Sequence, residues 1–246
     1  MIWELIYRIG VDYLHVWKAY SFSSPISVFV TFVKLIKDNN TLGIAIFISL
    51  RRVFIGYFIS LAVGVILGMV VVRLKYIGSN VSPLLLGLQT LPNVCWIPFA
   101  ILWLGLNESA IIFVVAVGST FSVAIAVEAG IKNIEPIYIS VARTMGAKGF
   151  VLYKDIILPA AFPSIISGMK QGWSFAWRAL MAGEMLSATI GLGQLLMMGR
   201  EVLDMSQVIA VMIIIIVIGI VVDRLVFGRI EARVRYRWGF QQKRYE

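Results

Sequence analysis

Three polar side chains recur at helical spacing inside an apolar stretch of the sequence. Gln171, Ser174 and Arg178 lie at offsets of three and seven, so a helix places them on one face. An arginine stays charged at physiological pH and costs about 2.5–3.5 kcal/mol at the centre of a membrane-spanning helix. We therefore expect Arg178 to face a polar cavity and to favour an anionic solute. The alternative for Arg178 and for the nearby Lys170 is an internal ion pair, and Lys170 could also extend to the membrane surface.

A second group of polar side chains lies where an apolar run is interrupted by proline. Gln89 and Asn93 offer amide groups beside Pro92, and Pro98 follows closely. Proline breaks the helical hydrogen-bond ladder, and broken helices at mid-membrane often mark a translocation path. Gln89 and Asn93 are therefore predicted to join Gln171, Ser174 and Arg178 along that path. The alternative is a kink that serves packing alone.

A charged segment, residues 129–158, interrupts the apolar chain. Asn133 and Pro136 are predicted to begin a helix and Gly146 to end it, and a second short helix is expected before Leu158-Pro159. The segment is amphipathic, and its apolar side chains are exposed unless something covers them: Ile137, Tyr138, Val141, Met145, Phe150, Leu152 and Tyr153. This pattern indicates a docking element for a cytoplasmic partner, or a hairpin that folds back on the membrane surface.

Composition places these segments in a membrane protein. Of 246 residues, 60% are hydrophobic and 14% charged, and the mean hydropathy is +0.90, which no soluble core of this size could accommodate. A spanning helix needs about 20 apolar residues. The sequence predicts an all-α membrane protein with five spans: 53–72, 84–106, 109–127, 160–186 and 207–222.

The distribution of basic residues predicts the orientation of the spans. The net charge is +9, which we interpret as an orientation signal and not as a nucleic-acid surface. Basic residues cluster after the first span, in the segment 129–158 and after the fifth span, whereas the opposite loops, 105–108 and 187–206, hold only Arg200. This places the N-terminus outside and the C-terminus in the cytoplasm. Arg51 and Arg52, at the outer edge of the first span, oppose the rule.

The two ends of the chain differ from its middle. Residues 1–40 carry a polar stripe, Glu4, Arg8, Asp12 and His15, and are predicted to form an amphipathic segment at the membrane interface. Residues 41–228 are predicted to form the transmembrane domain, and 229–246 a basic cytoplasmic tail. His15, the only histidine, has no neighbouring metal-ligating side chain, so we expect no metal site.

Small residues recur every four positions in three of the spans. They are Gly56, Ser60, Gly64 and Gly68; Gly118, Ser122 and Ala126; and Ser164, Gly168, Gly172 and Ala176. Such stripes let membrane helices approach closely. We expect a tightly packed bundle, with a sliding surface as the alternative.

The pattern Gly146, nine residues, Ile156-x-Leu158-Pro159 resembles the cytoplasmic "EAA" loop of ABC-importer permeases. Ser140-Val141-Ala142 stands where that loop has Glu-Ala-Ala, so the family's glutamate is missing. The segments "SLRRVFIGY", "LPNVCWIPFAILWLGL", "AWRALMAGEML" and "IGLGQLL" resemble the nitrate/sulfonate/taurine-type branch. The likeness covers residues 49–239, although the full apolar span that usually precedes a Trp-Glu-Leu-like end in this branch is not part of a sequence that starts at "MIWEL".

The resemblance implies the five-helix core of a type I importer permease. Two permease chains would form the pore, two ATPase subunits would bind the loops, and an extracytoplasmic binding protein would deliver the solute. The residues implied to couple to the ATPase are Ser140, Val141, Ala142, Arg143, Met145, Gly146, Ala147 and Lys148. The sequence holds no Gly-Lys-Ser/Thr phosphate loop, so we expect no ATPase activity and no cofactor in this chain.

Two other classes of membrane protein compete with this interpretation. A self-sufficient channel or ion-coupled transporter would function without an ATPase and would distribute charges over several spans, whereas only the fourth predicted span has internal charge. A scaffold or insertase needs no polar path and would leave Asn93 and Arg178 unexplained. Co-purification with an ATPase separates these classes.

Overall fold

A computed structural model of the chain describes residues 2–14, 18, 21–37 and 41–237, and these residues form helices connected by short turns, with no strand among them. The elements are α1 (Ile2–Tyr7), η1 (Arg8–Tyr13), α2 (Pro25–Lys37), α3 (Thr41–Arg73), α4 (Lys75–Thr90), η2 (Asn93–Trp96), α5 (Ile97–Leu104), α6 (Glu108–Lys132), α7 (Pro136–Thr144), α8 (Gly149–Leu152), η3 (Tyr153–Ile157), α9 (Leu158–Leu186), α10 (Leu192–Glu201), α11 (Met205–Val222), η4 (Asp223–Gly228) and α12 (Arg229–Arg237).

Four stretches of helix among the described residues are long and apolar enough to cross a membrane: 41–73, 108–132, 149–186 and 205–234. The predicted span 84–106 is instead a broken pair, in which residues 80–90 and 93–104 meet at 98°. Proline explains the break, because Pro92 supplies no N–H and Leu91 before it adopts an extended conformation with ψ 123°. Counting this bent pair as one span brings the candidate spans among the described residues to five.

The first span begins earlier than predicted. Helix α3 starts at Thr41 and not at Val53, so Arg51 and Arg52 lie within the helix. The predicted start is wrong because two adjacent arginines ordinarily mark the edge of an apolar span. Carboxylates on other helices pair with them, as described below, and this pairing allows the helix to continue through two charged positions.

Glycine stripes set the packing of α3, α6 and α9. A Cβ at Gly64 of α3 would lie 2.8 Å from the Cβ of Val123 on α6. A Cβ at Gly168 of α9 would lie 1.9 Å from that of Ala126, also on α6. Both separations are too short for any side chain, so the helices approach backbone to backbone. The predicted tight bundle is confirmed at these positions.

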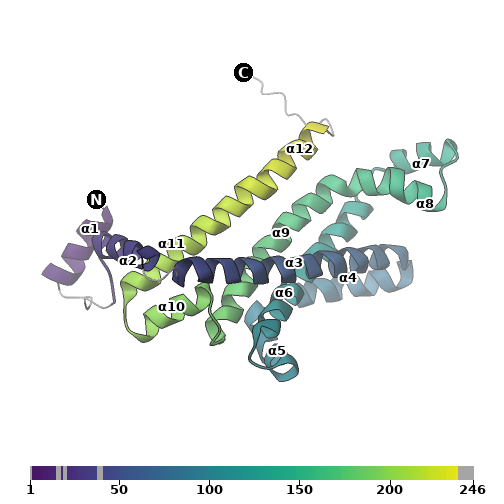
Figure 1. The fold of residues 1–246 in the computed structure, drawn as a ribbon. Coiled ribbons are helices and arrows are strands. Elements are labelled where there is room, and N and C mark those ends of the chain that lie inside the picture. The colour runs from purple at the N-terminus through teal and green to yellow at the C-terminus, as the bar shows by residue number, and fades with distance from the viewer. Residues whose placement is uncertain (1, 15–17, 19–20, 38–40, 238–246) are drawn as a thin grey trace, which may run out of the picture.

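The helical hairpin of residues 136–157 and the segments near the N-terminus occupy opposite ends of the molecule (Figure 1). The hairpin α7–α8 projects at one end, and α1, α2 and α10 lie toward the other.

Residues 187–206 were predicted as a loop, yet they contain the ten-residue helix α10. In α1 and η1, Glu4 and Arg8 form an ion pair of 2.9 Å, whereas His15 of the predicted polar stripe lies outside the described residues.

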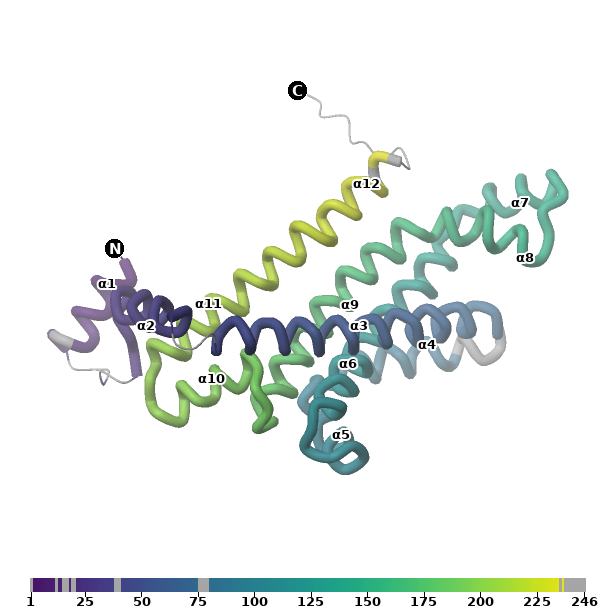
Figure 2. The backbone as a smooth tube through the Cα atoms, viewed as in Figure 1, coloured from purple at the N-terminus to yellow at the C-terminus, as the bar shows by residue number. Residues whose placement is uncertain are grey.

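The hairpin continues directly into the membrane. Residues 149–186 form one helical stretch of 38 residues, so Leu158-Pro159 does not separate a short helix from the span (Figure 2). Pro159 is accommodated in the first turn of α9, where the π-helical η3 precedes it. Asn133 was predicted to begin the hairpin helix but instead ends α6, and Glu135 precedes Pro136 at the start of α7.

Candidate functional site: an exposed hairpin and a polar path

The tip of the α7–α8 hairpin is a tight turn that requires glycine. Gly146 has φ +89°, in the left-handed region, and its N–H donates to the carbonyl of Arg143 at 3.0 Å. Ala147 N–H donates to the carbonyl of Ala142 at 2.9 Å, which closes the turn. Gly149 at the start of α8 has φ +55°. The prediction that a glycine ends this helix is confirmed.

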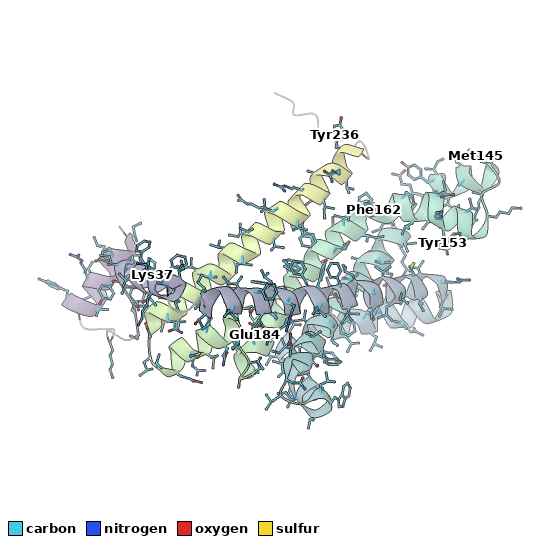
Figure 3. The ribbon with its side chains drawn as sticks, in the orientation of Figure 1. Lys37, Met145, Tyr153, Phe162, Glu184 and Tyr236 are labelled. Atoms are coloured by element: carbon cyan, nitrogen blue, oxygen red, sulfur yellow. The ribbon has the colours of Figure 1, made fainter. Side chains whose placement is uncertain are left out.

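The hairpin presents apolar side chains to its surroundings. Met145 at the tip is 74% exposed and Phe150 is 79% exposed, and Figure 3 shows Met145 at the extremity of the molecule. Ile137, Tyr138, Val141 and Tyr153 are also exposed. Leu152, predicted to be exposed with them, is buried against the base of the hairpin. A surface this apolar at the end of a projecting element is typical of a docking site.

Most residues that the resemblance linked to coupling lie on the outside of the hairpin. Exposed members are Ser140, Val141, Arg143, Met145, Gly146 and Lys148. Ala142 is buried in the cluster that holds the hairpin together, and Ala147 is half-buried. These two alanines therefore shape the hairpin, whereas the other six are available to a partner.

A cavity of about 300 Å³ brings together three of the residues predicted for the path. Gln89 and Asn93 enter it from the broken helix and Arg178 from α9, with Thr90 and Phe175 beside them. Asn93 also has a structural role. Its side-chain amide donates to the carbonyl of Phe175 at 3.3 Å and fixes the break against α9. Residues more than 80 positions apart in sequence thus share one polar recess.

Arg178 has no carboxylate partner among the described residues. Its Nε donates to the carbonyl of Ser174 at 3.0 Å, and its guanidinium carbon lies 4.6 Å from the centre of the Phe175 ring. These contacts hold the group in place and leave its terminal nitrogens to the cavity. Ser174 lines a second cavity, of about 570 Å³, together with Arg178, and Gln171 is exposed on the same face of α9.

Lys170, the other cation of this helix, is engaged elsewhere. Its Nζ lies 3.3 Å from Asp223 Oδ2 and 3.9 Å from Glu231 Oε2, on the C-terminal helical segment. The internal ion pair that we considered as an alternative is therefore the observed arrangement for Lys170. Arg178 is left as the cation of α9 without an acidic partner among the described residues.

A buried polar centre that sequence reasoning did not identify joins α3 and α9. The Glu184 side chain is 0% exposed and accepts a hydrogen bond from Ser49 Oγ at 2.8 Å. It also pairs with Arg52 Nη1 at 2.9 Å, and Figure 3 shows Glu184 within the bundle. Arg51 pairs with Glu108 at 2.5 Å, and Arg52 Nε lies 3.6 Å from the same carboxylate.

The sequence contained a signal for this centre. Ser49, Arg52, Glu184 and the glycines 191 and 193 all fall in segments whose likeness to the permease branch was noted: "SLRRVFIGY", "AWRALMAGEML" and "IGLGQLL". The three segments are far apart along the chain, and the fold brings them to one point. The signal is that a glutamate near the end of a span requires a basic partner, and Arg51 and Arg52 lie at the edge of the first predicted span.

Comparison with known proteins gives one family. The profile described as "Binding-protein-dependent transport system inner membrane component" matches residues 60–236. A putative ABC transporter permease protein of Methanocaldococcus jannaschii is 36% identical over 72% of this chain and 67% of its own length. A putative aliphatic sulfonates transport permease protein of Bacillus subtilis is 29% identical over 96% of this chain and 83% of its own length.

A solved structure shows the same fold. A chain of the MetNI methionine ABC transporter, in an inward-facing conformation, superposes with a TM-score of 0.67. The match covers 79% of this chain and 96% of that one at 19% sequence identity.

Proposed function

The chain belongs to the family of binding-protein-dependent transport system inner membrane components, and we propose that two copies of it form the pore of an ATP-driven importer for a small anion. It is a multi-pass inner-membrane permease subunit with the helical fold of type I ABC importers. It is not an enzyme, because ATP hydrolysis in this family resides in separate subunits. The family implies ATPase and substrate-binding partners.

The observation that supports coupling is the exposed apolar hairpin. We propose that Ser140, Val141, Arg143, Met145, Gly146 and Lys148 enter a surface cleft of the ATPase. Because residues 149–186 form one continuous helical stretch, a displacement of the hairpin is transmitted directly to α9, which carries Arg178. ATP-driven closure of the two ATPase subunits would then switch the pore between its inward-open and outward-open states.

The substitution Gly146→Glu tests this coupling. A glutamate at φ +89° strains the turn and places a carboxylate at the hairpin tip, so ATPase association and uptake should fall at least tenfold while the permease remains in the membrane. Gly105→Glu is the matched control, because Gly105 has φ +81° in the turn between α5 and α6 and a Cβ there would meet only Asn107, at 3.6 Å. Co-purification with the ATPase and uptake in proteoliposomes are measured for both.

Two results would contradict the proposal. One is full ATPase association and uptake by the Gly146→Glu protein. The other is uptake by the permease alone in proteoliposomes without ATPase, which would indicate a channel or an ion-coupled transporter.

Support for an anionic solute comes from Arg178. The guanidinium faces a polar cavity without an acidic partner among the described residues, and a cation in that setting favours an anion. The relative in Bacillus subtilis is named for aliphatic sulfonates. We propose a nitrate-, sulfonate-, taurine- or bicarbonate-like solute.

The proposed orientation places the hairpin and the C-terminus in the cytoplasm and the N-terminus outside. Its support is the distribution of basic residues, which lie mainly after α3, in the hairpin and after α11. Residues 41–228 would form the transmembrane domain, between an interfacial N-terminal segment and a basic tail.

A further inference from the structure

Helix α10 takes its N-terminal cap from other helices. The residue before it is Gly191, which has no side chain to cap with. Leu192 N–H donates to Ser49 Oγ of α3 at 2.9 Å, and Gly193 N–H donates to Glu184 Oε2 of α9 at 3.0 Å. A carboxylate at a helix N-terminus is also favoured by the helix dipole. The start of α10 is therefore fixed by α3 and α9 together.

The contact between Glu184 and α10 leaves no space for a side chain at Gly191 or Gly193. A Cβ at Gly191 would lie 2.5 Å from Glu184 Cδ, and a Cβ at Gly193 would lie 2.6 Å from Glu184 Cβ. Glycine at these two positions allows the backbone of α10 to rest directly on the carboxylate. The glycines are thus required by the cap and not by a flexible turn.

Arg52 stabilises the contact between Glu184 and the start of α10. Its Nη1 pairs with Glu184 and also donates to the carbonyl of Ile190 at 2.9 Å, so it ties α3 to the connection between α9 and α10. Glu184 is 0% exposed and the Arg52 side chain 4% exposed. If Arg52 and Glu184 separated, each charge would be buried without water or a partner, so separating α3 from α9 at this point is strongly unfavourable.

Helix α11 is held differently. Near its start, the Gln207 side-chain amide donates to the carbonyl of Leu195 on α10 at 2.9 Å. Further along, α11 and α9 line the cavity of about 570 Å³, and Trp177 of α9 reaches α11 at Gly219, where a Cβ would lie 3.6 Å from the indole Nε1. The ion pair between Lys170 and Asp223 that crosses the far end is half-exposed, and such pairs contribute little.

We infer that Ser49, Arg52 and Glu184 are positioning residues that join α3, α9 and α10 into one body, which keeps its shape through the transport cycle, and that α11 pivots against this body from its α10 end. The inference rests on the proposed function, because it assigns a mechanical role within that cycle. The second arm of the hairpin continues into α9 and therefore moves with the joined body.

Distances between spin labels in the assembled importer test the inference. Cysteines for labelling replace Ile44 on α3, Met198 on α10 and Ile220 on α11, all exposed, in a Cys95→Ser background. Between the nucleotide-free and nucleotide-trapped states, the 44–198 distance should change by less than about 2 Å and the 44–220 distance by more than about 5 Å. A large change in the first distance, or no change in the second, would overturn it.

Substitutions in the centre give an independent test. Glu184→Gln should broaden the 44–198 distance distribution and lower uptake at least tenfold. The double substitution Arg52→Met with Glu184→Met leaves no unpaired buried charge, so the complex should still assemble. The distance distribution should remain broad, because methionine cannot cap α10. Glu201→Gln, at the exposed far end of α10, is the control and should leave the distribution narrow.

The outcomes separate this inference from the proposed function. A narrow 44–198 distribution in the Glu184→Gln protein, or recovery of a narrow distribution in the double variant, would show that the centre does not position α10. Wild-type protein that binds no ATPase subunit would instead contradict the proposed function, and the resting 44–198 distribution could still be measured in that protein.

Discussion

At the scale of single residues, the two cations of α9 have separate roles. Lys170 is neutralised by Asp223 at 3.3 Å, whereas the Arg178 guanidinium stacks on Phe175 and faces the polar cavity. The carboxylate nearest to Arg178 along α9 is Glu184, which is already committed to Arg52 and Ser49. Because Glu184 pairs with Arg52, this carboxylate does not neutralise Arg178, which supports the proposal that Arg178 meets the solute.

Arg178→Gln tests this role at the residue scale. The substitution removes the charge and keeps a polar side chain, so uptake of an anionic solute should fall at least tenfold while the yield of assembled complex changes less than twofold. Arg200→Gln, at an exposed basic position on α10, is the matched control and should retain uptake. Radiolabelled solute uptake in proteoliposomes measures the effect. The anion role would be disproved if the Arg178→Gln protein took up the anion as fast as the wild type. It would also be disproved if the natural solute were uncharged and the variant transported it at the wild-type rate.

At the scale of elements, close helix approach determines the bundle. Helix α6 lies between α3 and α9, and the glycines of its neighbours rest on its valines and alanines. Gly56 of α3 faces Val115 in this way, and Gly172 of α9 faces Val123. Since lipid gives apolar helices no hydrophobic reason to associate, these contacts supply van der Waals packing that side chains of ordinary size would prevent.

Gly168→Ala and Gly87→Ala form a matched pair at this scale. The new methyl group at 168 would lie 1.9 Å from the Cβ of Ala126, so the helices must separate, at a cost of about 1–3 kcal/mol. At Gly87 on α4, a Cβ would meet nothing within 4 Å, and alanine favours a helix by up to about 1 kcal/mol. Thermal unfolding in detergent should show a lower midpoint for the first protein only. Equal midpoints would contradict the packing role of Gly168.

At the scale of the whole molecule, the two ends carry different chemistry. One end holds the apolar hairpin and most of the basic residues beyond the spans. The other holds α10 and the turn from α5 to α6, where Asn107 caps the next helix through Ala110 N–H at 3.2 Å. This difference supports the proposal that the hairpin end receives the driving motion and the opposite end admits the solute.

Single cysteines test the orientation of the protein in the membrane. In the Cys95→Ser background, Lys148→Cys and Arg235→Cys should resist a membrane-impermeant maleimide applied to intact cells, and Asn107→Cys should react. The reason is the excess of lysine and arginine on the cytoplasmic side of membrane proteins. Labelling after permeabilisation controls for accessibility of each thiol. Reaction of Lys148→Cys from outside alone would reverse the proposed orientation.

The sequence by itself determined the features that depend on local chemistry. Apolar runs located the spans, because about 20 apolar residues are needed at any position to cross the hydrocarbon. Gly146 predicted its turn, because glycine adopts a positive φ without strain. The glycine stripes predicted close packing, since helical spacing alone places those residues on one face.

Only the tertiary structure decided which groups neutralise one another. Arg52 and Glu184 lie 132 positions apart in sequence, and no local pattern specifies that they meet. Their pairing explains why α3 extends through two arginines and why residues 192–201 form a capped helix where a loop was predicted. Leu152 and Ala142 turn inward because both pack in one apolar cluster with residues of α6 and α9. Hydrophobicity and turn geometry are properties of a segment, whereas the partner of a buried charge is a property of the packed bundle.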